Sequence, residues 1–171
     1  MKQARLYLYA PSGALLHKTE FARAQKRLTQ LGLAVELDEG CLSRYQRFAG
    51  TDEERIAAIH RAAKSGSDFA MITRGGYGLT RILDGLDYEL IAQAIEQGTQ
   101  FIGLSDFTAF QSAVLAKTGK ITWAGPTAVH YFGVGGMSEP DKNGKRTRLK
   151  PDEITEACFM DVVEGVSEGC G

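Results

Sequence analysis

The sequence predicts an α/β fold, a doubly wound and mostly parallel sheet with helices on both faces. Short β-favouring runs alternate along the chain with helical patterns of about a dozen residues, which is the order of βαβ units. The chain has 171 residues, 43% of them hydrophobic. This is enough for one domain of ordinary size with its own core, plus a remainder.

Five strands and the helices between them follow from the spacing of the apolar residues. Strands are expected at 4–9, 33–37, 69–73, 100–104 and 121–124. Helices are expected at 19–31, from 51 onwards, in a short stretch up to 83, at 88–96 and after 105. The second helix has the clearest start, because Thr51 and Glu54 form a capping-box pattern.

The composition changes after residue 132. Glycine, serine and proline become frequent, and residues 142–150 are strongly basic. We expect residues 1–132 to form the α/β domain, 133–150 a linker and 151–171 the start of an incomplete second domain. The basic residues could contact an anionic partner or could be a solvated part of the linker.

Composition and charge narrow the class of protein. Twenty basic and twenty-one acidic side chains give a net charge of −1 and the cations are scattered, so nucleic acid is not an expected partner. No apolar run is long enough for a signal peptide or a membrane span, so we expect a cytoplasmic protein without membrane association. Cys41, Cys158 and Cys170 are odd in number and far apart, which favours free thiols. No cofactor is expected.

The segment with the most chemical content is Gly103-Leu104-Ser105-Asp106, where the fourth strand meets a helix. On such a corner the hydroxyl of Ser105 points away from the sheet, and the backbone N–H of Asp106 lies near the positive end of the helix. The arrangement resembles the nucleophile elbow G-x-S-x-G, with Phe107 in place of the second glycine. Ser105 is also a preferred helix N-cap residue, so the segment alone leaves both interpretations open.

The loops after strands one, three, four and five should meet at the carboxyl edge of the sheet, where ligands bind in open α/β folds. The loop after the third strand, Arg74-Gly75-Gly76-Tyr77-Gly78, is the most distinctive. Its glycines allow a close backbone approach, so an N–H of this turn can complete an oxyanion hole with that of Asp106. A phosphate cradle is the competing interpretation, but the spacing fits neither a dinucleotide fingerprint nor a P-loop.

A serine nucleophile needs a base, and the chain has three histidines. His17 and His60 are expected on the surface, His60 on a helix whose Arg55 and Arg61 are expected to be exposed as well. His130 is the only histidine expected near the carboxyl edge of the sheet, where the ligand-binding crevice lies. Metal binding is not expected, because no His, Asp or Glu residues show the spacing of metal ligands.

Five segments, in order, resemble those of the L,D-carboxypeptidases, also called muramoyltetrapeptide carboxypeptidases. They are Tyr9-Ala10-Pro11-Ser12-Gly13, Phe48-Ala49-Gly50-Thr51-Asp52-Glu53-Glu54-Arg55, Arg74-Gly75-Gly76-Tyr77-Gly78, Gly103-Leu104-Ser105-Asp106 and Gly125-Pro126. Members of this family are cytoplasmic serine peptidases that need no metal. They remove the terminal D-alanine from the tetrapeptide of recycled murein, cutting an L,D bond. The resemblance therefore implies a serine peptidase with a murein peptide as its substrate.

The resemblance also implies roles for single residues. Ser105 is the nucleophile, and the backbone N–H groups of Asp106 and Gly76 form the oxyanion hole. Arg74 could pair with a substrate carboxylate through two hydrogen bonds, or could be a surface arginine at a strand end. The residues expected to bind substrate come from the loops after the first and third strands: Pro11, Ser12, Arg74, Gly75 and Tyr77.

The chain also departs from the family pattern. Family members have a C-terminal domain that supplies the glutamate and histidine of a Ser-Glu-His triad, and no residue of this sequence matches either. His130 does not correspond to that histidine, and residues 164–166 resemble the opening strand of that domain. We therefore expect a truncated chain with very low activity alone, the alternative being a natural short form that has lost activity. Its uncovered face predicts self-association, for example as a homodimer.

Two other functions stay open. The same crevice could belong to a non-catalytic module that binds a peptide or glycopeptide, with Arg74 on the carboxylate of that ligand. The family pattern also includes relatives that hydrolyse a peptide-nucleotide antibiotic, that is, amide hydrolases of the microcin-immunity type. The exact substrate is therefore not fixed by these segments.

Overall fold

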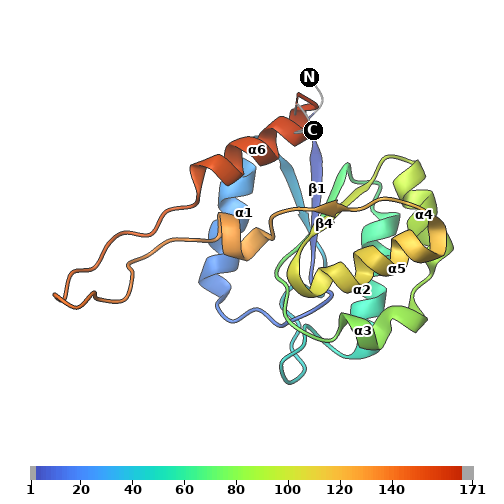
Figure 1. Ribbon diagram of the computed structural model, residues 1–171, viewed down its shortest axis with the longest axis horizontal. Helices are drawn as coiled ribbons and strands as arrows, with labels where there is room; N and C mark the ends of the chain where they lie inside the picture. Colours follow the sequence, from blue (N-terminus) through green and yellow to red (C-terminus); the bar gives the residue numbers. More distant parts are fainter. Residues whose placement is uncertain (1–2, 167–171) are drawn as a thin grey trace.

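The computed structural model describes residues 3–166 and contains one five-stranded sheet. Its strands are β1 (Arg5–Tyr9), β2 (Ala34–Leu37), β3 (Phe69–Ile72), β4 (Gln100–Gly103) and β5 (Trp123–Ala124). They lie in the order β2-β1-β3-β4-β5, and every neighbouring pair is parallel. The predicted fold, a doubly wound parallel sheet, is therefore confirmed (Figure 1).

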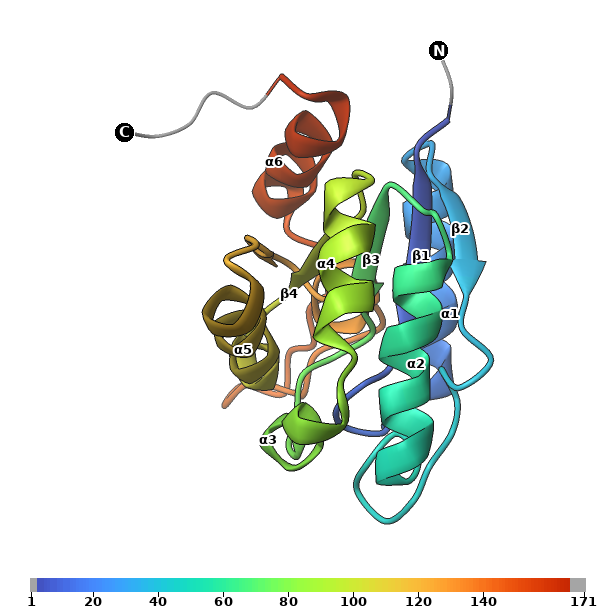
Figure 2. The same cartoon turned by 90° about the vertical axis from the view of Figure 1, so that its right-hand side faces the viewer.

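Helices cover both faces of this sheet (Figures 1 and 2). One face carries α1 (Lys18–Gln30), the short π-helix η3 (Ala128–Phe132) and α6 (Glu153–Glu164). The other carries α2 (Asp52–Lys64), α4 (Tyr88–Glu96) and α5 (Thr108–Thr118). Shorter helices connect them: α3 (Leu79–Ile82), η1 (Leu83–Gly85) and η2 (Ser105–Phe107). Alternate residues of β1 serve the two cores, Leu6 and Leu8 facing α1, and Tyr7 and Tyr9 facing α2.

The start of α2 follows from its local sequence. The hydroxyl of Thr51 accepts the N–H of Glu54 at 3.3 Å, and the carboxylate of Glu54 accepts the N–H of Thr51 at 2.7 Å. The predicted capping box is thus confirmed. It fixes the position at which α2 begins, directly after the loop that contains Phe48.

The fifth strand is shorter than predicted. We expected residues 121–124, but β5 contains only Trp123 and Ala124, which pair with Ile102 and Gly103. β5 is the edge of the sheet, and Ile121 before it is exposed. A strand at the edge pairs with one neighbour only, and the pairing of β5 with β4 is limited to these two residues.

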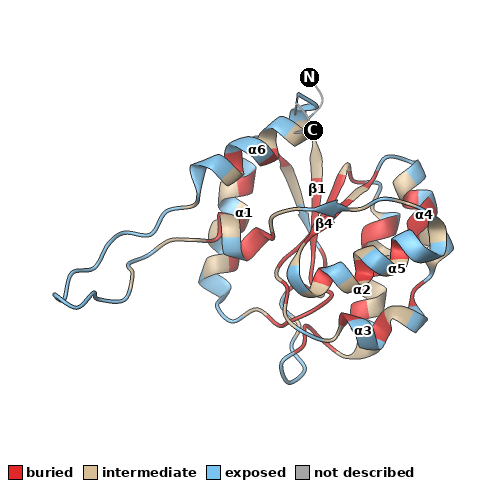
Figure 3. Ribbon diagram, viewed as in Figure 1, coloured by how far each residue is buried: buried red, intermediate tan, exposed pale blue. Residues whose placement is uncertain are grey.

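Residues 133–150 form an arm that leaves the domain and returns to it (Figures 1 and 3). Its two limbs are joined by the N–H of Ser138, which donates to Thr147 O, and by the N–H of Leu149, which donates to Gly136 O. The returning limb places α6 on the same face of the sheet as α1. The segment expected to be a linker therefore runs between two parts of one packed structure.

The last described helix belongs to the packed core. Phe159 of α6 is 4% exposed and contacts the rings of Phe69 and Phe132. The expectation of an opening strand at 164–166 is wrong, because α6 continues to Glu164 and ends at Gly165 in the left-handed conformation. That a second domain begins in this region stays a prediction.

Two further expectations concern the cysteines and membrane association. Cys41 is buried and Cys158 exposed, and both are free thiols, whereas Cys170 lies outside the described residues. In the described part of the chain, none of the helices is both long and apolar enough to cross a bilayer.

Candidate active site

Ser105 lies at a sharp corner between β4 and η2. Leu104 before it is extended, and Ser105 itself has φ of +66°, in the left-handed region. Only one other described non-glycine residue, Gln46, has a positive φ. A non-glycine residue adopts this conformation at a cost, and such strain is concentrated at functional sites. The corner exposes the side chain of Ser105 at the carboxyl edge of the sheet.

The corner also explains the glycine two residues before Ser105. A Cβ on Gly103 would lie 2.6 Å from Cδ1 of Phe107 and 2.9 Å from Cδ1 of Ile72. Only glycine therefore lets the strand pass this close to the ring that begins the following helix. In the described residues no side chain caps η2 or α5, so the N-cap interpretation of Ser105 is wrong.

Two glycines of the loop after β3 pack directly against Ser105 and the loop after β1. A Cβ on Gly75 would lie 3.0 Å from Cβ and 3.1 Å from Oγ of Ser105. Gly76 has φ of +141°, and a Cβ there would lie 2.8 Å from Cα of Gly13. The N–H of Gly13 donates to Gly75 O at 3.3 Å. Among the described residues, no group accepts the N–H of Gly76, which leaves it available to a ligand.

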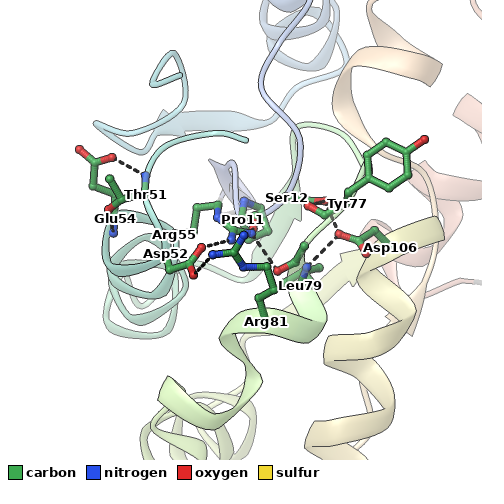
Figure 4. Close-up of polar contacts among 11 residues, drawn as sticks. Pro11, Ser12, Thr51, Asp52, Glu54, Arg55, Tyr77, Leu79, Arg81 and Asp106 are labelled. Carbon is green, nitrogen blue, oxygen red and sulfur yellow. Dashed lines mark hydrogen bonds and ion pairs between the residues drawn. The ribbon is translucent and has the colours of Figure 1, made fainter. Parts of the chain in front are cut away.

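The side chain of Asp106, in the loop after β4, bonds to the segments that follow β1 and β3 (Figure 4). Its Oδ2 accepts the buried hydroxyl of Ser12 at 2.5 Å and the N–H of Leu79, at the start of α3, at 3.2 Å. From the sequence, only the backbone N–H of Asp106 is expected to take part in the site. The carboxylate was missed because its two partners lie 27 and 94 residues away along the chain.

Arg55 was predicted to be exposed, and this is wrong. Its side chain is 0% exposed, and its guanidinium contacts Pro11 O, Gly78 O and Asp52 (Figure 4). The signal was present in the helical spacing, because Arg55 is in phase with the buried Ala58, Ile59 and Ala62. A charged residue on a buried stripe indicates a specific partner rather than solvent.

The predicted substrate-binding residues are only partly free to contact a ligand. Tyr77 is 67% exposed, with the guanidinium of Arg47 5.7 Å from the centre of its ring. Arg74 donates from Nη1 to Ala14 O at 3.0 Å, so one of its nitrogens already holds the loop after β1. Pro11 and Ser12 are buried in the loop, with the hydroxyl of Ser12 on Asp106.

An open cavity of about 590 Å³ lies beside Ser105. It is lined by Arg74, Gly75, Gly76, Tyr77, Leu104, Ser105, His130 and Tyr131. The structure thus brings together the serine, the glycine turn and the arginine that the sequence predicted at one edge. Tyr131 was not predicted, since η3, which carries it, is a π-helix of only five residues and is too short for a helical pattern in the sequence.

His130 is the histidine nearest this chemistry, as expected. It lines the cavity, and its Nδ1 lies 3.3 Å from Oγ1 of Thr127. Burial and the positive charge of Arg74 lower the pKa of His130, which favours the neutral ring. Among the described residues, no hydrogen bond joins His130 to Ser105. No group of three or more His, Cys, Asp or Glu residues in the described ranges could hold a metal ion.

Comparison with known proteins identifies the family. Residues 6–125 match the family model of the LD-carboxypeptidase N-terminal domain. The chain belongs to this family. The murein tetrapeptide carboxypeptidase of Pseudomonas aeruginosa is 31% identical to this chain over 144 residues, 83% of the chain.

Solved structures give the same result. The muramoyltetrapeptide carboxypeptidase of Oxalobacter formigenes is 30% identical over 93% of this chain, with a TM-score of 0.73. The microcin C7 self immunity protein MccF, in complex with aspartyl sulfamoyl adenosine, covers all of the chain with a TM-score of 0.78. At 23% identity the MccF likeness shows the shared fold alone. The chain spans less than half the length of the curated relatives it matches, 45% of the Pseudomonas protein.

Proposed function

We propose that this chain carries the nucleophile of a serine carboxypeptidase that removes the terminal D-alanine from murein tetrapeptide. The observation that carries the proposal is Ser105, exposed and in a left-handed conformation where a helix begins, with the backbone of Gly75 packed against it. This is the geometry of a nucleophile elbow. Membership of the LD-carboxypeptidase family supports the reaction class.

The proposed chemistry is acyl transfer. Oγ of Ser105 attacks the carbonyl carbon of the last peptide bond, and its proton passes to a base. The C–N bond then breaks, D-alanine leaves with a proton on its amine, and water hydrolyses the acyl-serine ester. The N–H groups of Gly76 and Asp106 are proposed to hold the oxyanion, one from the glycine turn and the other from the start of a helix.

Arg74 is proposed to bind the terminal carboxylate of the peptide. A carboxypeptidase must recognise this group, and Arg74 lines the cavity beside Ser105. Its hydrogen bond to Ala14 O fixes one nitrogen of the guanidinium, so the group is held in place before substrate binds. The proposed roles of Gly75, Tyr77, Pro11 and Ser12 are to shape the pocket around the same peptide.

The base is proposed to come from residues that relatives have and this chain does not span. The family resemblance assigns it to a Glu–His pair in the C-terminal half, and no residue described here hydrogen-bonds Oγ of Ser105. The isolated chain is therefore expected to turn over very slowly. The same proposal includes a cytoplasmic location, a role in murein recycling and a homodimer. Size-exclusion chromatography tests whether the protein is a homodimer.

The proposal is tested on a protein in which this sequence is followed by the C-terminal half that relatives have, by following the release of D-alanine from murein tetrapeptide with mass spectrometry. Ser105→Ala should reduce the rate by about 10⁴-fold or more, while peptide affinity stays the same. Thr108→Ala, which removes an exposed hydroxyl three residues further on, is the matched control and should leave the rate unchanged.

Three outcomes would change the assignment. An unaltered rate in Ser105→Ala would remove this serine as the nucleophile. Peptide binding without turnover in the parent protein would favour the non-catalytic module. Hydrolysis of an aspartyl sulfamoyl nucleoside in preference to tetrapeptide would favour an amide hydrolase of the microcin-immunity type.

A further inference from the structure

We propose that Arg55 is a positioning residue for the Ser105 site, a role that rests on Ser105 being the nucleophile. Arg55 lies on α2, a helix that contributes no residue to the cavity beside Ser105. Its guanidinium is nevertheless buried. A charged group is costly to bury, so its partners at this place indicate what it stabilises.

One nitrogen of Arg55 holds two loops at once. Nη1 lies 3.1 Å from Pro11 O, in the loop after β1, and 3.1 Å from Gly78 O, in the loop after β3. The other terminal nitrogen, Nη2, pairs with Oδ1 of Asp52 at 2.6 Å. The ring of Phe48 lies against the guanidinium, with 4.8 Å between Cζ and the ring centre. The guanidinium of Arg55 is therefore held along its edge by these oxygen atoms and on its face by the ring of Phe48.

The two carbonyls flank the backbone that packs against Ser105. Pro11 stands two residues before Gly13, and Gly78 two residues after Gly76. Between these anchors the loops meet directly, since the N–H of Gly13 donates to Gly75 O. Arg55 holds both loops from the α2 side, while the carboxylate of Asp106, the residue after Ser105, bonds to both loops from the other side (Figure 4).

The loop after β3 is shaped to receive this arginine. Gly78 has φ of +97°, and a Cβ there would lie 2.6 Å from Cε1 of Phe48 and 3.2 Å from Nη1 of Arg55. A lysine at position 55 would keep the positive charge but lose the planar fork that spans several acceptors. Substitutions at position 55 can therefore test the charge of the side chain separately from its shape.

The consequence for Ser105 is geometric. If Arg55 is lost, the glycine turn is no longer fixed relative to Ser105, and its N–H groups move from the position in which they stabilise negative charge. An oxyanion donor that is removed typically costs about 10²–10³ in rate. The same N–H groups would stabilise a thiolate at position 105, which gives a readout that needs no turnover.

The experiment uses Ser105→Cys in a chain that also carries Cys158→Ser and Cys170→Ser. The remaining Cys41 is buried, and burial raises its pKa to about 12, so it reacts slowly. The rate of alkylation by iodoacetamide against pH then gives the pKa of the thiol at position 105. Arg55→Lys and Arg55→Met should each raise this pKa by about one unit and slow alkylation at pH 7 about five- to tenfold.

Arg61 provides the matched control. It lies on the same helix and donates two hydrogen bonds to Asp38 at the end of β2, at 2.7 and 2.9 Å, away from the two loops. Arg61→Lys and Arg61→Met should leave the thiol pKa at its parent value. If Arg55→Met fails to fold, Asp52→Asn replaces it, because this change weakens the hold on the Arg55 guanidinium while leaving the arginine present.

The outcomes separate the possibilities. An equal rise of the thiol pKa in Arg55→Lys and Arg55→Met supports positioning, since lysine keeps the charge. A rise in Arg55→Met alone assigns the effect to charge and overturns the proposal, as does an unchanged pKa in both. Because no turnover is measured, the result is independent of whether Ser105→Ala abolishes carboxypeptidase activity.

Discussion

Ser105 has an exposed hydroxyl and a left-handed backbone conformation, which is unfavourable for any residue with a Cβ. The left-handed conformation turns the chain away from β4 at once, so that the hydroxyl stands clear of the sheet edge. Gly75 then fills the space behind it without a side chain of its own. The strain at one residue is thus maintained by the packing of the residues around it.

Ser105→Gly should stabilise the fold, because glycine adopts the left-handed conformation without a steric penalty. That penalty is about 1–2 kcal/mol for other residues, and the greater freedom of glycine in the unfolded chain offsets about 0.4–1 kcal/mol, so a gain of up to about 1 kcal/mol is expected in the free energy of unfolding. Urea denaturation measures it. Ser105→Ala keeps the Cβ and should give no such gain; an equal gain there would contradict the backbone explanation.

At the level of elements, α6 shows how a helix far along the chain completes the core. Phe159 fills the space between β3 and η3, and Arg27 of α1 holds the buried carboxylate of Glu156 through two nitrogens. The hydrogen bond with Glu156 raises the pKa of Arg27. One aromatic side chain and one ion pair therefore fasten α6 to α1 and the sheet, on the face opposite α2.

Phe159→Ala should lower the free energy of unfolding by about 3 kcal/mol, because a buried ring is lost and a cavity remains. Hydrogen exchange of the amides in α6 should accelerate more than that of β1 or β3, since the helix loses its main apolar contact. Ile154→Ala on the same helix is the control, as this residue is 74% exposed, and should change stability by less than about 0.5 kcal/mol. Equal effects of the two substitutions would show that α6 is not docked as described.

For the whole molecule, protonation of histidines links stability to pH. His60 accepts the N–H of Asp87 at Nε2, 2.9 Å away, and burial lowers the pKa of its ring. His130 is shifted in the same direction, by burial and by the charge of Arg74. In both cases the unfolded chain binds a proton more readily than the folded one. Stability is therefore full above the ordinary histidine pKa of about 6.5 and is lost as the pH falls below it.

The free energy of unfolding should consequently be lower at pH 5.5 than at pH 7.5, as measured by urea denaturation at the two values. Burial raises the pKa of Asp38, but hydrogen bonds from Arg61 and Tyr7 outweigh it and lower the pKa overall, so this carboxylate stays ionised over the window. Replacing both histidines, as His60→Asn with His130→Asn, should flatten the dependence. A protein that becomes more stable on acidification would show that the histidines are not buried in this way.

The sequence alone was enough to predict the parallel α/β fold, the position of Ser105 at the end of the fourth strand and the glycine turn beside it. These follow from local patterns: apolar periodicity, the capping box of Thr51 and Glu54, and the fixed rule that parallel strands end at one edge. The roles of Arg55 and of the Asp106 carboxylate depend instead on contacts made in the folded chain. Apart from Asp52 on the same helix, their partners are carbonyl, hydroxyl and N–H groups that lie 23 to 94 residues away, and no local pattern marks a backbone acceptor as the partner of a distant side chain. The helical spacing already placed Arg55 on the buried stripe of α2, but only the structure identifies the two loops between which its charge is buried.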